Sequence, residues 1–334
     1  MLTAIRAPRV KQYTLKVLAT LGAIAIILSA AACKINPTPP DRYALVYGIS
    51  AYQDNSTISN LNYTDDDARA VAEMLHSKGF EVHLRVNDES GSYPYAADVA
   101  AATKQKFIDD ITSFAGGLGS SDLLLVYFSG HGAQGLNGNT GDEDQFSDAQ
   151  DEYIVFYPDD GQSEAEFLVS DTEFFSYLTQ SAPQKRVIMI DACNSGGFIG
   201  SEYDYDALPG DYSTSNTRSG DIMSSSLDAF FKPKTGDIPS SEAIVITAAG
   251  EAEVSWEAFG HGFLTFGFLY SAEYGDYDKN GYIDTGEVYR YTRSYIENNW
   301  NPLGESYSEE DQAEHQFMPH ISGGPVDYIL FKAD

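Results

Sequence analysis

The chain has 334 residues, of which 50 are Asp or Glu and 20 are Lys or Arg, so its net charge at pH 7 is −30. Such an acidic protein repels phosphate backbones and attracts cations or basic substrates, so nucleic acid is not an expected partner. The length suffices for one large α/β domain with a sizeable core, and no internal repeat divides it.

The N-terminal segment has the composition of a secretory signal. Four basic residues and no acid precede or begin an apolar stretch over residues 17–32, which ends in small residues before Cys33. The stretch is shorter than the about 20 residues of a membrane span, and small residues before a cysteine are typical of lipoprotein signals. We expect residues 1–33 to be a signal peptide with lipidation at Cys33. A plain signal peptide and an uncleaved anchor are the alternatives.

This signal predicts that the protein is exported. It would be a membrane-anchored lipoprotein facing the periplasm or the cell surface, or it would be secreted, and it would contact the membrane only through the N-terminal lipid. Without residues 1–33, 16 basic residues face 50 acidic ones, and the net charge becomes −34.

A Pro-rich tether at residues 34–41 precedes the expected domain, residues 42–334. Apolar runs of strand length alternate there with segments of helical spacing, and two long polar insertions, residues 135–152 and 198–241, interrupt them. The pattern predicts about six strands in a mainly parallel sheet, with helices on both faces. The expected strands are residues 43–49, 80–86, 122–128, 186–190, 243–248 and 326–331, and the expected helices are residues 65–78, 103–114 and 171–178.

Two of the expected strands end in reactive side chains. The run at residues 122–128 leads into Ser-Gly-His-Gly, which contains His131 and Gly132, and the run at residues 186–190 leads into Asp-Ala-Cys-Asn-Ser-Gly-Gly, which contains Cys193. Active sites of such sheets lie at the carboxyl ends of strands. A thiol whose pKa is near 8.5 needs an imidazole to take its proton. We therefore expect a catalytic dyad of His131 and Cys193, with an oxyanion hole from the amides of Gly132 and Cys193. The alternative is an inert buried cysteine and an unrelated turn histidine.

His261 is another candidate for the base. It precedes a Phe-rich helical run and is interpreted as a turn or helix cap.

Other enzyme classes fit the sequence less well. No Gly-x-Ser-x-Gly motif supports a serine hydrolase. The glycines at 135, 138 and 141 match no phosphate-binding loop, and acidic residues follow them.

Residues 276–287 follow the pattern of an EF-hand calcium loop, with Gly281 at the sharp turn. Calcium is the expected cofactor, in a structural or regulatory role, and no organic cofactor is expected. The alternative is a solvated acidic turn. The expected ligands are the side chains of Asp276, Asp278, Asn280, Asp284 and Glu287 and the carbonyl of Tyr282.

The Ser-Gly-His-Gly and Asp-Ala-Cys-Asn-Ser-Gly-Gly motifs resemble those of caspase-like cysteine peptidases, in particular the bacterial metacaspase-like branch of peptidase family C14. The resemblance implies the caspase-haemoglobinase fold. It also implies that Asp67, Ser129 and Asp191 line the pocket for the residue before the scissile bond, and Asp191 stands in place of the Gln of true caspases. Carboxylates there would favour cleavage after Arg or Lys and reject Asp. For Asp67, charge pairing at the N-terminus of a helix is the alternative.

The resemblance implies two further features. A second calcium site would use Asp151 and Asp171, although Ser170 stands in place of a further Asp. Self-cleavage would fall in the insertion after the nucleophile, and its basic residues are Arg218, Lys232 and Lys234.

The expected function is that of an exported or lipid-anchored cysteine endopeptidase that cleaves peptides or proteins after Arg or Lys and is stabilised by calcium. One alternative is a catalytically silent, calcium-binding scaffold lipoprotein on the same fold. A second is a calcium-stabilised surface module that has no use for Cys193.

Overall fold

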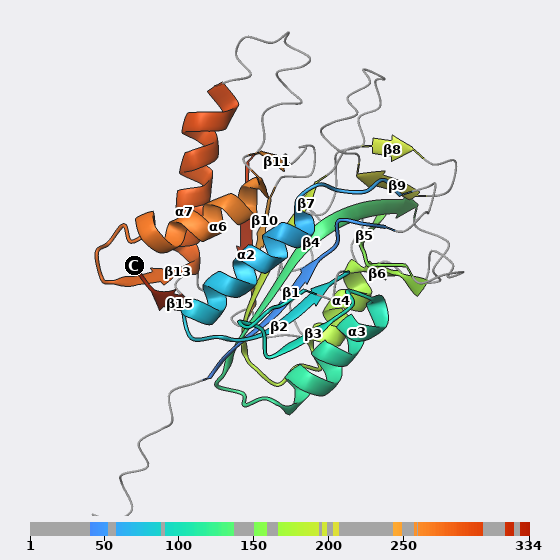
Figure 1. Cartoon of the computed structure of the whole chain (residues 1–334), viewed down its shortest axis with the longest axis horizontal. Coiled ribbons are helices and arrows are strands. Elements are labelled where there is room, and N and C mark those ends of the chain that lie inside the picture. The colour runs from blue at the N-terminus through green and yellow to red at the C-terminus, as the bar shows by residue number, and fades with distance from the viewer. Residues whose placement is uncertain are drawn as a thin grey trace, which may run out of the picture. The chain divides into compact units, whose positions relative to one another are not determined.

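The central sheet is a mainly parallel one, as expected from the apolar runs (Figure 1). The computed structural model describes residues 41–334 except 53–57, 88–90, 137–149, 159–165, 194–195, 199–202, 207–242, 249–256, 259, 303–317 and 324–327. In the sheet, β4 and β1 lie in the middle, flanked by β7 and β10 on one side and by β2 and β3 on the other. These six strands pair in parallel, and β14 adds an antiparallel edge beside β10. The strands are β1 (Arg42–Gly48), β2 (Glu81–Val86), β3 (Asp98–Ala100), β4 (Leu123–Leu136), β7 (Lys185–Cys193), β10 (Ala243–Thr247) and β14 (His320–Gly323).

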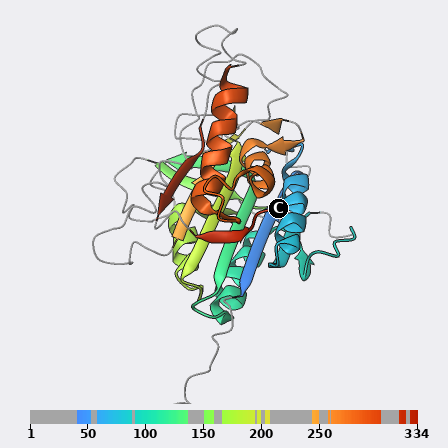
Figure 2. The same cartoon turned by 90° about the vertical axis from the view of Figure 1, so that its left-hand side faces the viewer.

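Helices cover both faces of this sheet (Figures 1 and 2). The apolar residues of each strand alternate between two cores, because successive side chains of a strand point to opposite faces. One core is closed by α2 (Thr64–Ser77), α6 (Phe263–Tyr274) and α7 (Thr285–Tyr295). The other is closed by α3 (Lys104–Asp109), a π-helical turn (Asp110–Phe114) and α4 (Asp171–Leu178). The layered α/β architecture predicted from the sequence is therefore correct.

The last predicted strand has a different partner from the one expected. The run at residues 326–331 was expected to complete the main sheet, but β15 (Ile329–Lys332) pairs with β13 (Tyr282–Asp284) in a separate two-stranded sheet. Leu330 and Phe331 are nevertheless fully buried, in the core under α2 and α6. An apolar run records burial but not its hydrogen-bonding partner, which explains the error.

Strand β4 continues well beyond its apolar run, and this extension pairs with an antiparallel part of the same sheet. Strands β5 (Gln150–Val155) and β9 (Tyr203–Asp206) pair with its second half. Residues 135–152, which were expected to be a polar insertion, therefore begin and end in strands. Two more short strands extend this antiparallel part of the sheet: β6 (Leu168–Ser170) beside β5 and β8 (Gly196–Phe198) beside β9.

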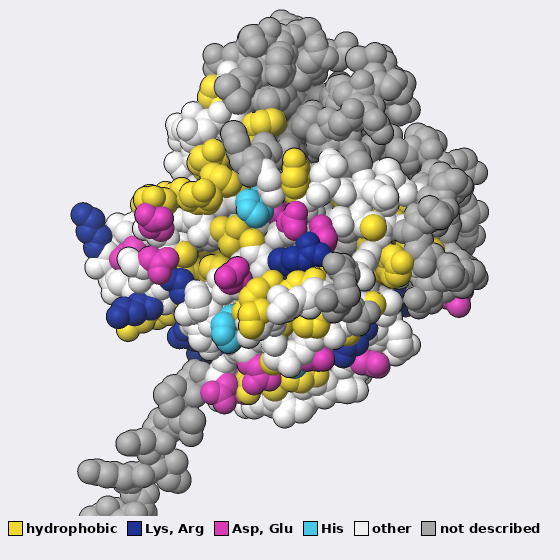
Figure 3. Space-filling model, in the orientation of Figure 1, with side chains coloured by type: hydrophobic (Ala, Val, Ile, Leu, Met, Phe, Trp, Pro, Cys, Tyr) yellow, Lys and Arg dark blue, Asp and Glu magenta, His cyan; other side chains and the backbone are white. Residues whose placement is uncertain are grey.

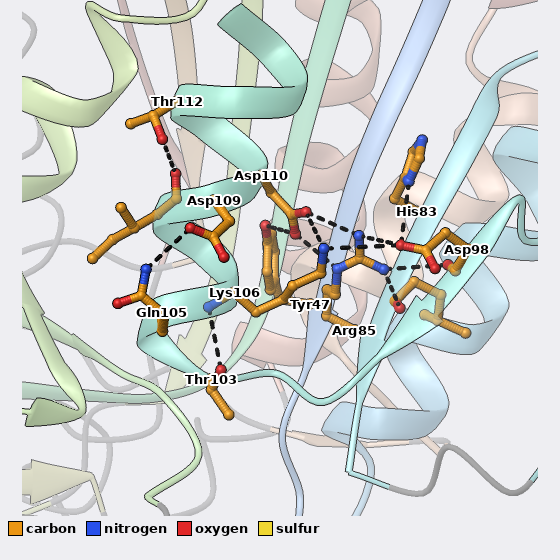
Figure 4. Close-up of polar contacts among 12 residues, drawn as sticks. Tyr47, His83, Arg85, Asp98, Thr103, Gln105, Lys106, Asp109, Asp110 and Thr112 are labelled. Carbon is orange, nitrogen blue, oxygen red and sulfur yellow. Dashed lines mark hydrogen bonds and ion pairs between the residues drawn. The ribbon is translucent and has the colours of Figure 1, made fainter.

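A buried ion-pair network ties β1 and β2 to the π-helical turn (Figure 4). The guanidinium of Arg85 is fully buried and donates to both carboxylate oxygens of Asp110, at 2.7 and 2.9 Å. Tyr47 also donates to Asp110, at 2.8 Å, and Lys106 and Asp98 complete the network. Burial alone would raise the pKa of Asp110, but the hydrogen bonds and charge of Arg85 lower it below its ordinary value. The buried charges of Arg85 and Asp110 thus compensate each other.

On the face in Figure 3, acidic side chains are interspersed with basic and apolar ones. Within the described part of the chain, no helix is both long enough and apolar enough to cross a membrane.

Candidate active site

His131 and Cys193 occupy paired positions on two neighbouring parallel strands. The register of β4 and β7 places Ser129 opposite Asp191 and His131 opposite Cys193. Neighbouring strands lie about 4.8 Å apart, so the two backbones are adjacent. The side chain of Cys193 lies outside the described part of the structure. The register bears out that the two strands are adjacent, and Cys193 ends β7. His131, by contrast, does not end its strand as expected, because β4 continues to Leu136.

The imidazole of His131 is fully buried and is held by one hydrogen bond. Its Nε2 atom lies 2.8 Å from the carbonyl oxygen of Ser59, in the segment between β1 and α2. Since a carbonyl only accepts, Nε2 carries the proton and Nδ1 keeps its lone pair. Among the described residues, Nδ1 has no hydrogen-bond partner. Burial lowers the pKa of His131 to about 4, so the ring is neutral at pH 7 and Nδ1 is a proton acceptor.

Tyr52 fixes the backbone of His131. Its hydroxyl accepts a hydrogen bond from the His131 amide at 2.8 Å and donates one to the carbonyl of Val155 at 3.3 Å. The two rings pack with their centroids 4.8 Å apart. A Cβ atom at Gly130 would lie 2.7 Å from the Tyr52 hydroxyl, which explains the glycine before the histidine. Sequence reasoning missed Tyr52 and Ser59 because neither stands in a motif, and Ser59 acts through its carbonyl.

The three residues expected to line the substrate pocket come together. Asp67 lies in the first turn of α2, Ser129 in β4 and Asp191 in β7, and all three are at most 2% exposed. The Ser129 hydroxyl donates to Asp67 Oδ2 at 3.1 Å. Asp191 Oδ2 accepts from the amide of Thr265 at 2.8 Å and from its hydroxyl at 2.5 Å.

His261 joins this cluster, which was not anticipated. It lies in β12 (His261–Gly262), directly before the Gly262 N-cap of α6, close to the predicted turn or cap position. Its Nδ1 atom lies 2.7 Å from Asp67 Oδ1, and the Gly262 amide donates to Asp67 Oδ2 at 3.2 Å. A Cβ atom at Gly262 would lie 2.7 Å from Cγ of Asp191, so Gly262 separates the two carboxylates.

The charges of this cluster influence each other. Burial raises the pKa of Asp67, whereas the hydrogen bonds from His261, Gly262 and Ser129 oppose this shift. The hydrogen bond to Asp67 raises the pKa of His261 above its ordinary value of 6.5, although desolvation opposes it. The signal available in the sequence was the His-Gly pair before α6, but its distance from Asp67 along the chain concealed the contact.

The residues expected to form the oxyanion hole lie at the same edge. Gly132 follows His131 on β4, where it is paired with Ile154 of β5, and Cys193 ends β7 on the opposite side. The two backbones are therefore neighbours, as an oxyanion hole built from both amides requires.

Three of the expected calcium ligands converge. Oxygens of Asp276, Asp278 and Glu287 lie within 4.8 Å of one another. Lys279 and Gly281 adopt left-handed backbone conformations, with φ of 61° and 81°, and turn the loop around these carboxylates.

The other expected ligands take part in the internal bonding of the loop. Asp284 is the N-cap of α7 and forms a capping box with Glu287, whose carboxylate receives the Asp284 amide at 3.2 Å. The side-chain oxygen of Asn280 accepts from the amide of Tyr282 at 2.7 Å. Tyr282 lies in β13, paired with Lys332.

Several predictions concern residues that the structure does not describe. The leader with Cys33, the tether up to residue 40 and the cleavage candidates Arg218, Lys232 and Lys234 lie outside the described residues. The backbones of Asp151, Ser170 and Asp171 lie in β5, β6 and at the start of α4, but their side chains are not described.

The comparisons with known proteins agree with this fold. The family model of the caspase domain matches residues 41–279, which is most of the chain, so the protein belongs to the caspase-domain peptidase family. The search of curated proteins found no match.

Two solved structures share the fold at low sequence identity. One is protein GSU0716 of Geobacter sulfurreducens, with a TM-score of 0.54 and 16% identity, covering 88% of this chain and 100% of the other. Another is caspase-1 of Spodoptera frugiperda, with a TM-score of 0.50 and 11% identity, covering 89% of this chain and 92% of the other. The caspase-haemoglobinase fold expected from the motifs is thereby confirmed.

Proposed function

We propose that this protein is a cysteine endopeptidase in which Cys193 is the nucleophile and His131 the general base. The observation that carries the proposal is the register that pairs the two residues, together with the buried imidazole whose Nε2 is anchored on Ser59. Anchoring one nitrogen leaves the other to exchange protons with the thiol and the leaving amine.

The chemistry would proceed in two steps. The Cys193 thiol transfers its proton to Nδ1 of His131 and attacks the peptide carbonyl, and the amine leaves with that proton as the thioester forms. Water then attacks the thioester, His131 takes its proton, and the thiol is restored as the acid leaves. The amides of Gly132 and Cys193 would stabilise the oxyanion in both steps.

The substrates we propose are peptides or proteins with Arg or Lys before the scissile bond. Asp67 and Asp191 place two carboxylates in one buried cluster beside the end of β7. Asp191 stands two residues before the nucleophile. A basic side chain would find opposite charge there, whereas Asp would meet like charge in a poorly hydrated site. Arg should be preferred because its planar guanidinium bonds carboxylates at two points.

We further propose that the loop at residues 276–287 binds calcium. Asp276, Asp278 and Glu287 offer oxygens within 4.8 Å of one another, a set of hard ligands that suits calcium. Occupancy would tie the end of α6 to the start of α7, because Glu287 belongs to the first turn of α7. The role we assign to the ion is stabilisation of this helix pair.

The leader supports export, and Cys33 is the residue that we propose to be lipidated. The lipid would anchor the peptidase to a membrane, facing the periplasm or the cell surface, and without lipidation the protein would be secreted. Extracellular calcium would then occupy the loop even if its dissociation constant were about 1 mM.

The test compares two fluorogenic peptides that differ only in Arg or Asp before the scissile bond, using protein that begins at residue 34. Wild type should hydrolyse the Arg peptide at least about a hundredfold faster. Cys193→Ala should hydrolyse neither, while His76→Gln, an exposed histidine near the end of α2, serves as the matched control and should retain wild-type rates. No hydrolysis by folded wild type would refute the peptidase and leave the silent scaffold, and equal measurable rates for Cys193→Ala and wild type would refute Cys193 as the nucleophile.

A further inference from the structure

The carboxylate of Asp67 is enclosed by donors from within the protein. Nδ1 of His261 lies 2.7 Å from Oδ1, and Oδ2 accepts from the Gly262 amide at 3.2 Å and from the Ser129 hydroxyl at 3.1 Å. Asp67 itself is fully buried, whereas the His261 side chain is 25% exposed. His261 therefore lies between Asp67 and solvent.

We propose that His261 determines the specificity of this pocket by setting its charge: when protonated it neutralises Asp67, and when neutral it leaves the pocket one charge more negative and a stronger binder of Arg and Lys side chains. This inference rests on the proposed function, because it concerns the pocket assigned to basic residues. It gives His261 a role other than that of the general base, which belongs to His131.

Asp67 and His261 titrate as one pair, whichever of their atoms holds the proton. At low pH, Asp67 and His261 together carry no net charge, and after loss of one proton they carry one negative charge. The hydrogen bond to Asp67 raises the pKa of His261 above 6.5, so this change falls at a higher pH than in a free imidazole. The neighbouring Asp191 accepts two hydrogen bonds from Thr265, which favour its carboxylate form.

Two other acidic residues near His261 also raise its pKa. On α2, Asp66 adds negative charge, although Arg69 pairs with it at 2.8 Å. On β7, Asp191 adds negative charge. On β11 (Glu257–Ala258), Glu257 stands opposite Gly262 in the register, and the first turn of α6 carries no acid. A cation bound near these acidic residues would compete with the proton on His261.

Linkage gives the sign of the effect. A cationic ligand prefers the deprotonated pair, so its affinity rises as the pH rises through the pKa of His261, and binding below that pKa releases a proton. A charge several Å away in a partly buried site changes the dissociation constant about tenfold.

The experiment measures argininamide binding to Cys193→Ala protein by calorimetry at pH 5.5, 7.0 and 8.5. The dissociation constant should fall about tenfold over this range, and buffers of different ionisation enthalpy should report proton release at pH 5.5. His261→Gln keeps a donor for Asp67 but no titrating imidazole, so between pH 7.0 and 8.5 it should bind with the high affinity and release no proton. His76→Gln, whose side chain is exposed on α2, should retain the pH dependence of the parent.

Each outcome bears on the proposal. A pH dependence that persists in His261→Gln between pH 7.0 and 8.5 overturns it, and so does pH-independent binding or no binding of argininamide to the parent protein. A second measurement follows the His261 imidazole by NMR in wild type and in Asp67→Asn, where the pKa should drop toward 6.5; an unchanged pKa would also overturn the proposal. Failure of the peptidase would look different: argininamide would bind with the expected pH dependence, but wild type would hydrolyse no Arg peptide.

Discussion

His131 of β4 and Cys193 of β7 stand directly opposite each other in the register of two parallel strands. The imidazole is presented with Nε2 bound to the Ser59 carbonyl and with the His131 amide bound to the Tyr52 hydroxyl. The position of the imidazole that we propose as the base thus depends on the segment after β1, which supplies both contacts.

Tyr52→Phe should lower kcat about tenfold and the free energy of unfolding by about 1–2 kcal/mol, because the buried amide of His131 loses its acceptor. The measurement is peptide hydrolysis combined with urea unfolding. Tyr63→Phe, at a tyrosine that is 36% exposed, is the matched control and should change neither quantity. Unchanged kcat in folded Tyr52→Phe would show that this contact does not position the base.

The pH dependence of kcat should report the low pKa of His131. The base must be neutral, and its pKa is about 4, so kcat at saturating substrate should stay constant as the pH falls to about 5 and then decline through pH 4. KM, by contrast, should rise already as His261 gains its proton. Circular dichroism at each pH excludes acid unfolding as the cause. A kcat decline centred near pH 6.5 would contradict a buried, neutral His131.

The buried network around Asp110 should be important for stability. Asp110→Ala leaves the Arg85 guanidinium buried without its main partner, and we expect a loss of about 3–5 kcal/mol in the free energy of unfolding. Lys106→Met removes a partner whose side chain is 31% exposed, and its cost should be about 1 kcal/mol or less. Denaturant unfolding of the two variants measures the difference. Similar losses for both would mean that Arg85 finds another counter-charge.

Calcium should raise the melting temperature by about 3–6 °C at millimolar concentration, because the folded loop binds it by mass action. Glu287→Gln should reduce this increment most strongly. Since Glu287 also accepts backbone hydrogen bonds, the variant will melt earlier even without calcium, so the increment is the relevant quantity. Glu73→Gln, at an exposed glutamate of α2, should keep the full increment. An increment of zero in wild type would make the loop a solvated turn.

Much of this fold was predictable because burial leaves a clear trace in the sequence. The apolar runs of β1, β4, β7 and β10 are buried on both faces, and such runs indicate a covered parallel sheet. Short or polar strands leave no such trace. Strand β3, three residues long, was missed for this reason, and β15 was assigned to the wrong sheet.

The residues of the candidate site likewise divide into those that a sequence motif indicates and those that no motif indicates. Motifs at strand ends brought out His131, Cys193 and Asp191, because parallel strands end at one edge. The contact of His261 with Asp67 and the support of His131 by Ser59 join segments that are distant in the chain. Such contacts arise from tertiary packing and follow no periodicity that a single sequence displays.

Covalent labelling shows whether Cys193 is a nucleophile beside a pocket for basic residues. Protein beginning at residue 34 is incubated with an acyloxymethyl ketone peptide that carries Arg before the reactive group, or with the same peptide carrying Asp, and the intact mass is then measured. We expect a single adduct on Cys193 with the Arg peptide, little with the Asp peptide, and none in Cys193→Ala or His131→Gln at matched times. Failure of the Arg peptide to label folded wild type, or equal labelling by both peptides, would contradict this expectation.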